Sequence, residues 1–201
     1  MIYKGAALNR KTVLPLFLIT LVYFALGFVN ILTAYLALAC MALPFIILAR
    51  QRKKSWCQGI CPRADFLSRL KPVSAGRAAP RVLTGEKVKR GVLTYFCMNL
   101  FFIVMSTFMV ASGRMAPIDR VRFLIAFQLP WELPQLVTFA GVSGAVIHLA
   151  FRFYSLMLTS TVAGVVLALL YRPRTWCMVC PINTLSDAAL GRVRTGGEPG
   201  R

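Results

Sequence analysis

The chain carries two short cysteine motifs of the same kind, each with a Trp directly before the first Cys and a Pro directly after the second. They are Trp56, Cys57, Cys61 and Pro62 in motif 1, and Trp176, Cys177, Cys180 and Pro181 in motif 2. Thiolate is the soft ligand that favours iron–sulfur clusters, zinc or copper(I). Proline after a ligating Cys recurs in ferredoxin-type runs. The motifs therefore predict a metal centre, with iron–sulfur favoured over a structural zinc site.

Two Cys pairs supply four thiolates. These suffice for one 4Fe–4S centre if both pairs lie on one face of the protein. Two clusters are the alternative if another chain completes each half-site. Cationic residues flank both motifs, and positive charge lowers a thiol pKa and stabilises the ligated form. These residues are Arg52, Lys53, Lys54 and Arg63 near motif 1, and Arg172 and Arg174 near motif 2.

The elements that must position these motifs are membrane helices. The chain is 58% hydrophobic, with a mean hydropathy of +0.67, whereas a soluble domain is about 45–50% apolar. Residues 13–49 contain no charge and are long enough for two spans of about 20 residues with a turn near residues 27–30. Residues 91–112 and 153–171 provide two more. The prediction is an all-α integral membrane protein of about four transmembrane helices.

The region between the third and fourth predicted spans is harder to assign. Prolines interrupt it, residues 136–151 are short for a span, and a charged residue, Arg152, follows them. We expect helices that lie at the interface or dip back into the membrane, with Trp131 as an anchor. Whether residues 136–151 cross the membrane stays open, and one extra crossing would place the two motifs on opposite faces.

The distribution of charge predicts the orientation. Of the 24 Lys and Arg residues, 20 lie before the first span, in residues 50–90 or after Tyr171, and 4 lie in residues 112–152. The positive-inside rule then places both termini and both motifs on the cytoplasmic side of the inner (cytoplasmic) membrane. A net charge of +18 would suggest nucleic acid in a soluble protein, but the apolar runs exclude that interpretation here.

The motif repeats at an offset of 120 residues, which predicts a single membrane domain over residues 1–201 built from two similar hairpins. Half one covers residues 12–70, a linker covers 71–90, half two covers 91–190, and a disordered tail covers 191–201. Each half ends in a cytoplasmic Cys-motif segment.

These motifs and the helix hairpins before them resemble the membrane-bound 4Fe–4S proteins of the NosR, NapH and CcoG type. The resemblance covers essentially the whole chain in outline and implies electron transfer at the membrane. It implies a quinone pool or a reductase system at one end, and other redox subunits or a soluble ferredoxin- or flavodoxin-like carrier as partners. The chain lacks the ferredoxin domain and the flavin-binding domain of larger members, so it resembles a subunit of a relay more than a self-contained catalyst.

The leading hypothesis is that Cys57, Cys61, Cys177 and Cys180 hold a 4Fe–4S cluster that passes electrons. The alternative is a membrane thiol–disulfide oxidoreductase with two Cys pairs, and a structural or copper(I)-delivery protein is a third class. Cys40 and Cys97 lie within predicted spans and are expected to act as small hydrophobes. The single histidine, His148, is either packed in the protein or takes part in quinol proton release, as Asp119 and Glu132 would.

Overall fold

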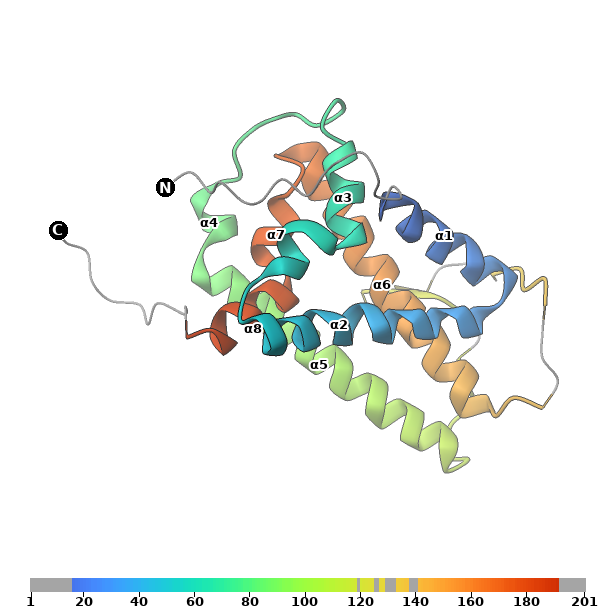
Figure 1. The fold of residues 1–201 in the computed structure, drawn as a ribbon. Coiled ribbons are helices and arrows are strands. Elements are labelled where there is room, and N and C mark those ends of the chain that lie inside the picture. The colour runs from blue at the N-terminus through green and yellow to red at the C-terminus, as the bar shows by residue number, and fades with distance from the viewer. Residues whose placement is uncertain (1–15, 119, 125–126, 129–132, 138–140, 192–201) are drawn as a thin grey trace.

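The computed structural model describes residues 16–118, 120–124, 127–128, 133–137 and 141–191 (Figure 1). Asp119, Trp131, Glu132 and the predicted tail after Gly191 lie outside these residues. Within them the chain is mainly helical. The longer elements, in chain order, are α1 (Leu16–Val29), η1 (Ile31–Tyr35), α2 (Leu36–Gln51), α3 (Pro62–Arg69), α5 (Glu86–Ala111), α6 (Gly144–Leu170) and α8 (Pro181–Ala189). The shorter ones are η2 (Trp56–Ile60), α4 (Arg81–Thr84), α7 (Thr175–Val179), β1 (Arg122–Phe123) and β2 (Phe127–Gln128).

Three helices in the described part are long and apolar enough to cross a membrane. They are η1 with α2, which together have 21 residues, α5 with 26 and α6 with 27. At a rise of 1.5 Å per residue each exceeds the roughly 30 Å hydrocarbon core. The described part of α1 has 14 residues and is shorter than a span. The protein is therefore compatible with a membrane location and has three candidate spans, and a fourth is not shown.

The predicted turn after the first apolar run is present at Asn30. The Asn30 side chain caps η1 by accepting a hydrogen bond from the Leu32 N–H at 2.8 Å. The break leaves further backbone groups without helical partners, and the side chain of Gln135 satisfies two of them. Its Oε1 accepts from the Ile31 N–H at 2.7 Å and its Nε2 donates to the Gly27 carbonyl at 3.1 Å. The turn is thus stabilised by a residue 104 positions away in the sequence.

The core lies where α1 and η1 pack against the first half of α6. Tyr154 is 3% exposed there, and its hydroxyl donates to the Phe24 carbonyl at 3.2 Å. Its ring lies directly against Gly27, where a Cβ would overlap with it. Ile31 and Ala34 complete this contact from η1. The absence of a side chain at Gly27 lets the two elements approach closely.

The region between α5 and α6 differs from the sequence-based expectation. Its described residues form no interfacial helix but a small antiparallel pair of strands, in which Arg122 pairs with Gln128 and Phe123 with Phe127. Residues 136–151 are not a separate piece either, since α6 begins at Gly144 and continues through Arg152. The charge at Arg152 suggested a helix boundary, but the residue lies inside a continuous helix, with its Nε atom buried.

An extended segment leading into β1 runs along α6, and polar side chains of α6 satisfy its backbone. The N–H groups of Ile118, Arg122 and Leu124 donate to side chains of α6 at 3.0 to 3.3 Å. The three acceptors are His148 Nδ1, Ser155 Oγ and Thr159 Oγ1. Non-helical backbone at membrane depth requires such internal partners. The described residues of this segment thus follow α6 through side-chain contacts, and only Arg122 and Phe123 of it form a strand.

The two Cys motifs lie at the same end of the molecule. In the described residues, the long helices between the two motifs are α5 and α6, which form an antiparallel pair. Figure 1 shows α3, α7 and α8 gathered at this end, with the end of α5 and the start of α6 at the other. The extra crossing that would have separated the motifs is not present in the described residues.

Candidate metal centre

The two motifs build the same local unit in two slightly different ways. In each, a short helical turn carries the first Cys, the second Cys has an extended backbone, and Pro begins the next helix at its first turn. Motif 1 has one more residue between its cysteines, and it forms a π turn closed by a 3.0 Å hydrogen bond from the Cys61 N–H to the Trp56 carbonyl. A π turn absorbs a single extra residue. Despite the different spacings, the second Cys of each motif is followed by a helix that begins at Pro.

All four motif cysteines line one cavity of about 350 Å³. The cavity lies between the motif segments and the ends of the spanning helices. Trp56 and Trp176 line it too, as expected for residues that shield a centre from water. Trp56 is 9% exposed, and the Trp176 Nε1 is buried without a hydrogen-bond partner. Residues 120 positions apart in the sequence thus face a common space.

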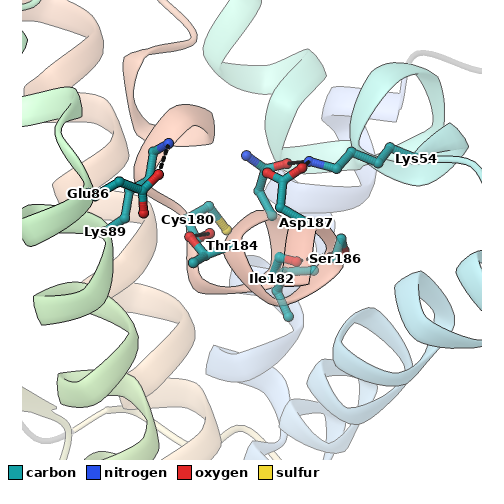
Figure 2. A network of polar contacts seen from close by, with 9 residues as sticks. Lys54, Glu86, Lys89, Cys180, Ile182, Thr184, Ser186 and Asp187 are labelled. Carbon is teal, nitrogen blue, oxygen red and sulfur yellow. Dashed lines mark hydrogen bonds and ion pairs between the residues drawn. The ribbon is translucent and has the colours of Figure 1, made fainter. Parts of the chain in front are cut away.

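Lys54, just before motif 1, joins it directly to the helix after motif 2. Its ammonium group forms an ion pair with Asp187 of α8, which Figure 2 shows, and donates a hydrogen bond to the Asn183 Oδ1 of the same helix at 2.9 Å. A second connection runs from the Arg174 Nε to the Ser68 Oγ at 3.0 Å. The sequence analysis named Lys54 and Arg174 only as cations near thiols. The partners lie more than 100 residues away, and no local pattern indicates them.

Burial, rather than neighbouring charge, sets the acidity of the thiols. It raises the pKa of Cys57 to about 11 and that of Cys177 to about 12, with the other motif cysteines adding to the increase. Burial also raises the pKa of Cys180. Lys54 lowers the pKa of Cys57 and Arg174 that of Cys177, by less than burial raises them. The cations therefore act in the expected direction, and desolvation by burial is the larger effect on the thiol pKa.

Cys40 is a fifth thiol on the cavity wall, which the sequence analysis did not foresee. It comes from α2 and lies near Arg63. The Arg63 guanidinium in turn donates to the Ser160 Oγ at 2.6 Å and contacts the Met157 sulfur at 3.4 Å. Arg63 therefore places a positive charge beside the thiols and ties α3 to α6. Cys97, in contrast, is exposed on α5.

His148 takes no part in this site. It is fully buried, its Nδ1 accepts from the Ile118 N–H at 3.1 Å, and its Nε2 lies 3.0 Å from the Ser106 Oγ. Because Nδ1 accepts a hydrogen bond, the proton of the neutral ring is on Nε2. The histidine is a structural link between α5, α6 and the extended segment, which is the packed role among those considered from the sequence.

The donor set fits a cluster better than a single ion. Four sulfurs around one zinc ion lie about 4 Å apart, as follows from a Zn–S bond of about 2.3 Å. In the part of the chain that the structure describes, no three His, Cys, Asp or Glu side chains are close enough to share one ion. In a 4Fe–4S cluster each thiolate binds a different iron, so the ligands stand farther apart. Four thiols around one roomy cavity match that arrangement.

Comparison with known proteins agrees with this chemistry. A family model described as "4Fe-4S binding domain" matches residues 33–66 and 155–195. Each matched segment holds one Cys motif and part of the helix before it. No curated protein and no solved structure matches the chain. The match indicates an iron–sulfur binding protein with a 4Fe–4S cluster as cofactor, and it suggests iron–sulfur electron transfer.

Proposed function

We propose that this protein transfers electrons at the inner membrane through one 4Fe–4S cluster held by Cys57, Cys61, Cys177 and Cys180. The observation that carries the proposal is that all four thiols line one cavity, two from each motif. One shared cluster uses every motif thiol and leaves none for a second. The cluster would supply one-electron redox chemistry, and the protein binds it, shields it with two Trp side chains and places Arg63 beside it.

The cluster would connect a carrier on the cytoplasmic side with a quinone or a reductase system. The Lys and Arg distribution supports a cytoplasmic position for the motifs. Basic residues on and before the first turns of α5 would attract an acidic ferredoxin- or flavodoxin-like partner. Lys87, Lys89 and Arg90 lie there because α5 begins at Glu86, not at the predicted residue 91.

The thiol–disulfide oxidoreductase is the competing function, and the chemistry of the site opposes it. Exchange requires an accessible thiolate with a lowered pKa. Burial raises the pKa of Cys57 and of Cys177, which disfavours the thiolate that exchange requires. Buried, protonated thiols beside one another suit delivery to a cluster, whose assembly displaces their protons.

The test is anaerobic purification in detergent, followed by iron and sulfide analysis and EPR spectra before and after dithionite. Cys57→Ser and Cys177→Ser should each abolish the signal of the reduced cluster, whereas the wild type holds about four irons per chain. Cys40→Ser is the control within the cavity and Cys97→Ser the control outside it, and both should keep the cluster. Wild-type protein without iron, with its Cys pairs titrating as reversible disulfides, would contradict the proposal and favour the oxidoreductase.

A further inference from the structure

One side of the cluster cavity is formed by α5 and α6 and carries no cysteine. Its residues are Tyr95, Phe96 and Asn99 from α5, Leu156 and Thr159 from α6, and Leu124 from the loop that follows β1. We refer to these six residues as the α5–α6 side. Apolar and aromatic groups dominate it. A cluster held by the motif cysteines does not explain why these residues line the cavity.

Two polar side chains of the α5–α6 side, those of Tyr95 and Asn99, come from α5. The Tyr95 hydroxyl is buried and forms no hydrogen bond. The side chain of Asn99 is also buried, and the residue lines both this cavity and a small neighbouring one. An apolar pocket into which a few polar groups converge is the usual form of a small-molecule site.

Two arginines stand behind Asn99. Arg122 and Arg152 line the small neighbouring cavity, which shares Asn99, Leu156 and Thr159 with the larger one. The Nε atoms of both arginines are buried without a hydrogen-bond partner. In the part of the chain that the structure describes, neither guanidinium forms an ion pair. Cations inside a membrane protein are costly to bury and usually mark a functional site.

These observations define the chemistry of a ligand. Apolar and aromatic walls favour a flat, apolar ring. The Tyr95 hydroxyl and the Asn99 amide favour oxygen atoms that accept hydrogen bonds. The paired guanidinium groups favour a ligand whose oxygens carry or gain negative charge. A small inorganic anion would satisfy the arginines but would leave the apolar wall without a partner.

We propose that the α5–α6 side of the cavity binds the headgroup of a membrane quinone. Tyr95 and Asn99 hold its oxygen atoms, and Arg122 and Arg152 provide the positive field behind them. The same helix presents apolar side chains at its surface, since Met98 and Phe102 are 47% and 46% exposed. The inference rests on the proposed function in placing the quinone in the same cavity as the cluster.

The sharpest variant is Tyr95→Phe, because the hydroxyl it removes has no partner in the protein. It should leave folding and iron content unchanged and weaken quinone binding about tenfold, the effect of one hydrogen bond. Asn99→Leu, Arg122→Met and Arg152→Met should weaken binding at least as much. Tyr35→Phe is the matched control, because its hydroxyl bonds to the Val146 carbonyl at 3.0 Å outside the cavity.

Binding is measured on the iron-loaded protein in detergent, with decylubiquinone and menadione as probes. The readouts are the rise in unfolding temperature with quinone concentration and the change in the EPR spectrum of the reduced cluster. The expected result is saturable binding that Tyr95→Phe weakens and Tyr35→Phe does not. Equal quinone binding by wild type, Tyr95→Phe and Asn99→Leu would overturn the site.

Two further outcomes separate this inference from the proposed function. Wild-type protein with about four irons but no saturable response to either quinone would overturn the quinone site and leave the cluster proposal intact. Stabilisation by sulfate or phosphate without any by quinones would replace the quinone with an inorganic anion and so refute the inference. Quinone binding that persists in the iron-free Cys57→Ser protein would support the site even if the cluster proposal failed.

Discussion

Lys54 connects the two motifs through a single side chain. It lies beside Cys57 and reaches Asn183 and Asp187 in the helix that follows Cys180. Its side chain is 12% exposed, so the pair is better protected from solvent than an ordinary surface salt bridge. This residue therefore has two possible tasks, which are to hold the motifs together and to place positive charge near Cys57.

Substitution at this position should separate the two tasks. We expect Lys54→Met to lose iron several-fold faster than wild type when challenged with a chelator, because the contact between the motifs is lost. The charge-swapped double variant Lys54→Asp, Asp187→Lys should recover most of the lost retention if the contact matters. Failure of the swap to recover it would assign the role to the positive charge beside Cys57.

Lys89 offers the matched control. It forms an ion pair with Glu86 on the surface of α5 at 3.3 Å, in the same view as Lys54 (Figure 2). An exposed pair of this kind contributes about 0–1 kcal/mol. Lys89→Met should therefore leave iron retention unchanged, and a loss equal to that of Lys54→Met would show a general effect of net charge.

At the residue scale, the sequence predicted the ligand set because Trp, two Cys and Pro recur in the same order. It did not predict the acidity of the thiols, since their burial depends on helices from both halves. It did not identify Cys40 either, because a single Cys inside an apolar helix has no pattern around it. Its place on the cavity wall depends on which face of α2 turns toward the motifs.

The break between α1 and η1 is the element whose stability depends most visibly on a distant side chain. Gln135 satisfies one N–H and one carbonyl at the break, so Gln135→Ala leaves both without their partner. We expect a loss of about 1–3 kcal/mol in the free energy of unfolding, the cost of unsatisfied buried polar groups. Thermal unfolding in detergent, followed by tryptophan fluorescence, measures it.

Gln128 is the control for this change. It is exposed on β2, in the same loop between α5 and α6. Gln128→Ala should change stability by less than about 0.5 kcal/mol. Equal effects of the two substitutions would mean that the loop as a whole, and not the contact with the helix break, determines the stability.

At the scale of elements, the sequence predicted the break because Asn and Gly interrupt an apolar run. It located α5 and the end of α6 from uncharged stretches. It failed at the start of α6, where Arg152 implied a boundary. A helix can continue through a charged residue if the protein accommodates that side chain. Hydropathy does not show whether such a site exists.

The topology of the whole molecule follows from the number of crossings between the motifs. Since α5 and α6 are the two candidate spans between the motifs in the described residues, the cytoplasmic position proposed for the motifs predicts Gly113 outside the cytoplasm and Gly191 inside it. We expect alkaline phosphatase inserted after Gly113 to be active, and a green fluorescent protein fused after Gly191 to fluoresce. Alkaline phosphatase is active only outside the cytoplasm, and green fluorescent protein fluoresces only inside it.

Reciprocal fusions provide the control for this experiment. Green fluorescent protein after Gly113 should be dark, and alkaline phosphatase after Gly191 inactive. The reverse result at both positions would place the Cys motifs outside the cytoplasm. If the same reporter worked at Gly113 and at Gly191, the chain would need another crossing between them. Either result would contradict the cytoplasmic position of the cluster.

At the scale of the molecule, the sequence predicted an all-helical membrane protein with both motifs on one face. The motifs do meet, and three candidate spans are present where about four were expected. The difference concerns α1, whose composition is that of a span and whose described length is not. Composition alone cannot show where a helix begins inside a long apolar run.

The position of the four thiols also governs how the protein is made. Because Cys57 and Cys177 are 120 residues apart, no complete ligand set exists until the ribosome has released the second half and α6 has entered the bilayer. Cofactor insertion must then be among the last events of biogenesis. With the proposed ligand set, the cluster would cross-link the first half of the polypeptide to the second. A protease that cut the exposed stretch around Arg77 would then leave the two fragments joined.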